Sequence, residues 1–162
     1  MNHKFTPGIF AGTVGAIVLG FYGMTMKAIG FTDRIYLDLA EVIILSNPQE
    51  GFIASIVGWV AHLMIGAIFG MLLCYFISTT SSSFWLLKGW GIGIFIWFSL
   101  LSMGKLYKLP LFMNIPPKSA LTLLSGSSVW GLVSIYVLKK ITGDFKTILN
   151  GKQRKKKKII KH

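Results

Sequence analysis

Residues 58–76 read GWVAHLMIGAIFGMLLCYF and lie inside an apolar stretch, 52–77, that contains no Asp, Glu, Lys or Arg. About 20 apolar residues in a helix, at 1.5 Å each, cross a hydrocarbon layer of roughly 30 Å. A backbone within lipid has to satisfy its own hydrogen bonds, and this stretch lacks the alternation of barrel strands. The stretch therefore predicts a helix that spans a membrane.

Three further stretches have the same character, at about 8–30, 84–104 and 119–138. The composition agrees with this interpretation, because 53% of the 162 residues are hydrophobic and only 14% are charged, whereas soluble domains average roughly 25% charged residues. We expect an all-α fold, a bundle of four transmembrane helices. Residues 1–141 form the expected membrane domain, and 142–162 form a basic tail that we expect to be disordered.

A short helix is predicted between the first two stretches, at about 33–47. Its apolar residues recur at helical spacing, and the acidic side chains Asp33, Asp38 and Glu41 are concentrated in this segment. This pattern is typical of an amphipathic helix that lies on the outer membrane surface. A second interpretation of the same carboxylates is an acidic mouth that attracts cations.

The segment 105–118, KLYKLPLFMNIPPK, joins the third and fourth stretches. Pro110, Pro116 and Pro117 exclude a regular helix, while several large apolar side chains disfavour full exposure to water. We expect the segment to follow the membrane interface or to dip into the bundle.

Small residues recur every fourth position in the first two stretches. Lipid tails give helices no hydrophobic reason to associate, so close backbone approach at small residues has to hold them together. These stripes are therefore predicted to face protein. Small residues in the third and fourth stretches are predicted to form further surfaces for close helix contact. The predicted helix-packing positions are Gly8, Gly12, Gly20, Gly58, Gly66, Gly70, Gly89, Gly93 and Gly131.

His62 lies roughly 15 Å along the second helix, near the middle of the membrane. An ionisable side chain at that depth is costly and normally faces the bundle interior or a wet cavity. Hydroxyls on other helices, or backbone carbonyls beside glycine, are its available partners, and the candidate polar site combines His62 with Ser99, Ser102 and Ser127. The histidine either links two helices by a hydrogen bond or has a proton-sensitive or ligand-contacting role.

The sequence contains no pattern that is typical of an enzyme. Paired carboxylates within the membrane stretches, a nucleophile with a placed base, a phosphate-binding glycine loop and a metal-ligand cluster are all missing. We therefore expect a non-enzymatic chain without a metal or cofactor.

Basic residues predict the orientation, because Lys and Arg are retained on the cytoplasmic side. With both termini inside, the cytoplasmic segments hold twelve of the 17 basic residues and the opposite side holds five. Membrane lipids are expected partners, and nucleic acid is disfavoured because no folded module or interleaved aromatic residue accompanies the basic tail. The tail residues expected to bind anionic headgroups are Arg154, Lys155, Lys156, Lys157 and Lys158.

Three apolar strings carry a resemblance: GIFAGTVGAIVLGFYG at 8–23, GWVAHLMIGAIFGMLLCYF at 58–76 and GWGIGIFIW at 89–97. In these strings the chain resembles small, functionally uncharacterised bacterial inner-membrane proteins of the YagU and YqhR kind. The resemblance implies four membrane spans in a bacterial plasma membrane and an undefined activity. It supplies no catalytic residues.

Two functions fit these patterns. The first is a structural or accessory subunit that acts through helix–helix association, as a homo-oligomer or with another membrane protein. The alternative is a small channel or transporter with a pathway near His62 and an acidic outer mouth.

Overall fold

The computed structural model describes residues 5–80 and 82–145. The described chain is all-helical, which confirms the predicted fold class, and four of its helices are long and apolar enough to cross a membrane. The basic residues 154–158 lie outside the described residues. The helices are α1 (Thr6–Ala28), α2 (Tyr36–Leu45), α3 (Phe52–Thr79), α4 (Trp85–Leu106) and α5 (Pro117–Ile141).

Prolines mark the start of two of the long helices. Pro7 lies in the first turn of α1, and Pro117 is the first residue of α5. Proline fits these positions because its fixed φ suits a helix and its missing N–H would have no partner there. Both helices therefore begin about two residues earlier than the apolar stretches alone predict.

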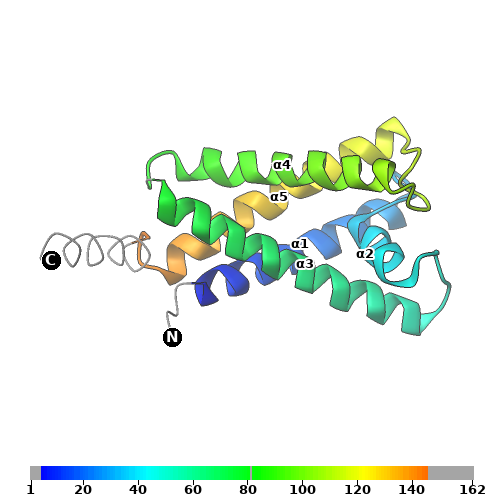
Figure 1. Ribbon diagram of the computed structural model, residues 1–162, viewed down its shortest axis with the longest axis horizontal. Coiled ribbons are helices and arrows are strands. Elements are labelled where there is room, and N and C mark those ends of the chain that lie inside the picture. The colour runs from blue at the N-terminus through cyan, green and yellow to red at the C-terminus, as the bar shows by residue number, and fades with distance from the viewer. Residues whose placement is uncertain (1–4, 81, 146–162) are drawn as a thin grey trace, which may run out of the picture.

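The four long helices form a row of contacts: α3 packs against α1, α1 against α5, and α5 against α4. The tight turn before Trp85 joins α3 to α4, but the two helices then diverge (Figure 1) and touch only weakly. The start of α1, the end of α5 and the α3–α4 turn lie at one end of the bundle (Figure 1). The opposite end, which carries α2, is called the α2 end below.

The short helix α2 lies at the open end between α3 and α4 (Figure 1) and packs mainly against α3. Leu39, Ala40 and Val42 are nearly completely buried, while Ile44 on the opposite side is exposed. The apolar face of this amphipathic helix is therefore turned toward the other helices of the bundle. The helix fills the gap that the divergence of α3 and α4 leaves.

The antiparallel pair α1 and α3 is held at backbone distance by its glycines. A methyl group added to Gly12 would collide with the carbonyl oxygen of Gly66 and with the backbone of Gly70. A methyl group on Gly8 would reach Cys74 in the same way. Only residues without a large side chain permit such an approach, so the small-residue stripes of α1 and α3 face each other.

Glycines also bring α4 and α5 together, with Gly89 and Gly93 lying against Gly131 and the Ser127 carbonyl oxygen. Gly91, between them, faces open space.

Two of the predicted packing glycines have larger neighbours. Gly20 accommodates the ring of Trp59, and Gly58 faces Leu37 and Glu41 of α2 rather than α1. The small residues of α3 thus contact two neighbours: α2 near the start of α3, and α1 along most of the rest of α3.

Candidate functional site

A small internal cavity is the candidate site, because it contains the intramembrane histidine and residues from all five helices. Its volume is about 40 Å³, which has room for about three water molecules. Its lining residues are Ala16, Leu19, Tyr36, Leu39, Ala40, Ile43, His62, Ile65, Gly66, Phe69, Ile96, Leu100, Ser127 and Trp130.

His62 lies on α3 at the boundary with α1 and is 5% exposed. Its Nε2 lies 3.0 Å from the carbonyl oxygen of Ala16, and because a carbonyl can only accept, Nε2 carries the proton and donates it. The imidazole also meets the ring of Trp59 edge to face, with centroids 6.1 Å apart. These contacts make His62 a polar link between α3 and α1, in agreement with the first of the two interpretations above.

Tyr36 and Ser127 form a second polar group at the cavity. Ser127 Oγ donates to the carbonyl oxygen of Leu123 at 2.8 Å, so its bond with the Tyr36 hydroxyl has the tyrosine as donor. Burial raises the pKa of the Tyr36 phenol, which keeps that proton in place. The pair joins α2 to α5 across the bundle.

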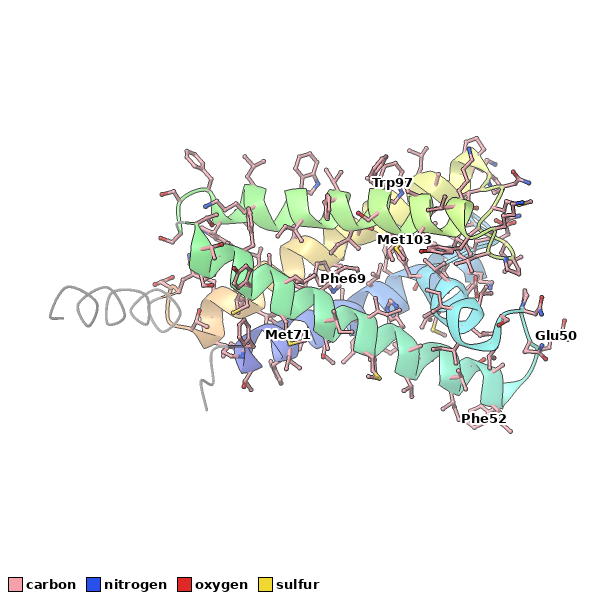
Figure 2. All side chains as sticks on the ribbon, in the orientation of Figure 1. Glu50, Phe52, Phe69, Met71, Trp97 and Met103 are labelled. Atoms are coloured by element: carbon pink, nitrogen blue, oxygen red, sulfur yellow. The ribbon has the colours of Figure 1, made fainter. Side chains whose placement is uncertain are left out.

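Trp130 is the largest side chain at the cavity and is 4% exposed. Its indole Nε1 donates to the carbonyl oxygen of Gly12 at 3.1 Å, so α5 is bonded to α1 at the level where α1 meets α3. Phe69, labelled in Figure 2, meets the Trp130 ring edge to face with centroids 6.3 Å apart. The aromatic pair closes the cavity on the α3 and α5 sides.

The structure brings Ser127 to the same cavity as His62, but it does not bring Ser99 or Ser102 there. Ser99 is half-buried elsewhere on α4, and Ser102 is exposed near the α2 end. Sequence reasoning did not select Tyr36 or Trp130. A usable signal for Trp130 was its position one residue before Gly131, which places its large ring beside a predicted close contact.

The three acidic residues of the predicted outer mouth all have partners. Asp38 forms an ion pair with Lys27, with Nζ and Oδ1 2.8 Å apart, and a Glu41 oxygen accepts the backbone N–H of Gln49 at 2.9 Å. Asp33 contacts Ser119 and Arg34. Two of the three carboxylates are therefore paired with a cation, while Glu41 accepts only a neutral N–H.

Asp33 accepts the Ser119 hydroxyl at 2.7 Å and pairs with the guanidinium of Arg34 at 3.1 Å. The Ser119 hydrogen bond, aided by Arg34, holds the pKa of Asp33 below its usual value. A lowered pKa means that the ionised form stabilises the fold, an effect present above the usual pKa and lost as the pH falls through the lowered one.

Arg34 also donates to the backbone carbonyl oxygens of Leu111 and Asn114 in the link between α4 and α5. Its side chain is 18% exposed. A single guanidinium therefore fastens the α1–α2 link to the α4–α5 link, since five N–H donors in a planar fork reach two carbonyls and a carboxylate together.

Arg34→Ala is expected to speed amide hydrogen exchange at residues 109–114 about tenfold, because hydrogen bonds to a charged donor contribute roughly 1.5 kcal/mol to local stability. Exchange followed by mass spectrometry in detergent micelles measures this. Lys108→Ala is the matched control, since Lys108 is exposed and has no ion pair within the described residues. Equal exchange in the two variants would contradict the role given to Arg34.

The chemistry available at the cavity is limited. No carboxylate lines it, and among residues 5–80 and 82–145 no three His, Cys, Asp or Glu side chains gather as a metal site would require. The polar groups at its wall are already bonded to one another or to backbone carbonyls. The arrangement suits structural linkage between the helices.

No family model, no curated protein and no solved structure matches the chain. The resemblance to the YagU and YqhR kind therefore stays a prediction from three short strings. The structure places the protein among multi-pass membrane proteins by the length and apolar character of its four long helices.

Proposed function

We propose that the protein is a non-enzymatic structural or accessory subunit that associates with a second copy of itself, or with another membrane protein, through the outer face of α4. The observation that carries this proposal is the one-sided packing of α4. Of the four long helices it is the least buried, and it packs closely against α5 alone. A helix covered on one side only has its other side free for a partner within the membrane.

The outer face of α4 carries a glycine between two large, exposed side chains. Leu87 and Phe95 are 61% and 68% exposed, and Gly91 lies between them with open space above it. Three residues at spacings of four share one helix face. A partner helix can approach closely at the glycine while the flanking side chains pack around it, as in other membrane helix pairs.

The interior supports the same proposal. The glycines of α1 and α3, and Gly89 and Gly93 of α4, already contact other parts of the same chain, which leaves Gly91 as the exposed glycine of α4. We further propose that both termini are cytoplasmic in a bacterial inner membrane. The distribution of Lys and Arg favours this orientation.

Cysteine crosslinking in native membranes tests the proposal. Cys74 is the chain's one cysteine and is buried, so Cys74→Ala gives a silent background for Gly91→Cys. We expect oxidation to form a dimer through position 91, or a benzophenone attached there to capture a membrane partner. Met64→Cys is the control, because Met64 is 62% exposed on α3. Monomer alone from both positions would overturn the proposal.

A small channel or transporter is the second candidate, and the observation that favours it is the cavity with His62 and Ser127 at its wall. A pathway would have to open through this space. Ion flux into proteoliposomes that falls at least tenfold in His62→Ala would favour transport over the subunit role. Flux equal to that of empty liposomes would remove this candidate.

A further inference from the structure

A second, larger hollow lies at the α2 end, between α4 and the link to α5, and has a volume of about 670 Å³. One of its walls is a single face of α4 that includes Phe98, Ser102 and Lys105. The other wall is the irregular segment 112–116. Trp97, labelled in Figure 2, lines the inner end, and its Nε1 donates to the carbonyl oxygen of Ala120 at 3.1 Å. This hydrogen bond therefore fixes the α4 wall of the hollow to α5.

The lining of this hollow changes from apolar to polar along α4. Phe98 lies seven residues before Lys105, about 10 Å deeper along the helix. Lys105 is next to the last residue of α4, with Ser102 one turn before it and Asn114 on the opposite wall. This order of groups matches an amphiphile whose polar head lies at the membrane surface and whose chain extends into the hydrocarbon layer.

The charge at this end favours an anion. Lys105 and Lys118 are exposed, and within residues 5–80 and 82–145 neither of them forms an ion pair. The nearby carboxylates Asp33 and Asp38 are already paired with Arg34 and Lys27. A group of unpaired lysines at the membrane surface attracts anionic headgroups, and a zwitterionic headgroup gains less from the same charges.

We propose that this hollow binds one anionic phospholipid. Its phosphate lies at Lys105, within reach of the Ser102 hydroxyl and the Asn114 amide, and one acyl chain runs along Phe98 toward the membrane centre. A lysine ammonium and two neutral donors are groups that phosphate oxygens accept from readily. This inference is independent of the subunit role, which uses Leu87, Gly91 and Phe95.

Native mass spectrometry of the full chain, titrated with phosphatidylglycerol or phosphatidylcholine in detergent, tests the site. We expect the first phosphatidylglycerol to bind about fivefold more tightly than phosphatidylcholine, and Lys105→Gln to remove most of that difference. Lys108→Gln is the control, because Lys108 lies at the same end but does not line the hollow. Each variant keeps the basic tail, so any lipid bound there contributes equally.

Ser102→Trp provides a second variant that acts by filling the hollow. Ser102 is exposed, so the fold tolerates the larger side chain, and retention of both lipids is expected to fall. Glycerol phosphate in the same titration is expected to displace nothing, and displacement by it would identify a soluble phosphate compound in place of a lipid. Equal affinity for the two lipids, or equal behaviour of Lys105→Gln and Lys108→Gln, would overturn the proposal.

Discussion

Gly12→Leu is expected to separate α1 from α3 and to lower the free energy of unfolding by about 3 kcal/mol, the upper part of the usual range for overpacking. The physical reason is that the space beside Gly12 is occupied by backbone. The carbonyl oxygen of Gly66 and the backbone of Gly70 lie where even a methyl group would be placed. Backbone in a helix cannot rotate away as a flexible side chain can, so the whole helix has to move.

Unfolding in mixed micelles of a mild detergent and dodecyl sulfate, followed by circular dichroism, measures this loss. Gly91→Leu is the matched control, since Gly91 is also a helical glycine within a membrane helix but has open space around it. In dilute micelles that keep the chain monomeric, its free energy of unfolding is expected to be unchanged or slightly raised, since Leu is a better helix former than Gly. Comparable losses in the two variants would show that the close backbone contact at Gly12 does not set the effect.

Trp130→Ala is expected to cost about 3 to 5 kcal/mol, as for other large side chains removed from a packed interior. The substitution removes the ring that packs beside Gly15 and Phe69, and it also removes the hydrogen bond to Gly12. The void would enlarge a cavity already lined by all five helices, so several helix contacts weaken together.

Trp130→Phe keeps a six-membered aromatic ring and removes the pyrrole part of the indole together with its N–H. We expect a loss of about 2 kcal/mol, smaller than for Trp130→Ala, which includes roughly 1 kcal/mol for the lost hydrogen bond. The same micelle titration measures both variants. If Trp130→Ala unfolds no more easily than Trp130→Phe, then the ring does not support the helix row as proposed here.

The sequence predicted which residues pack, but not always against which helix. A spacing of four residues places glycines on one face, so Gly12 and Gly66 could be assigned to a contact surface. Periodicity cannot say which neighbour lies opposite, so it predicted that Gly58 faces protein but not that this neighbour is α2.

The candidate polar site was predicted in part for a similar reason. His62 and Ser127 do share a cavity, whereas Ser102 does not. Ser102 is nine residues after Gly93, which is two and a half helical turns, so it lies on the opposite side of α4 from the packing glycines. This relation was present in the sequence. Tyr36 could not be placed, because its segment is rich in acidic residues and gives no sign that it enters the bundle.

The position of α2 has a consequence for synthesis. Its Tyr36 bonds to Ser127, 91 residues further along the chain, and Thr32 just before it bonds to Ser119. A ribosome therefore completes α1, α2 and α3 long before Ser119 and Ser127, the hydrogen-bond partners of this segment, exist. The short helix can pack against α3 first, but its bonds to α5 form only after the last membrane segment has been inserted, and only then can that end of the newly made protein close.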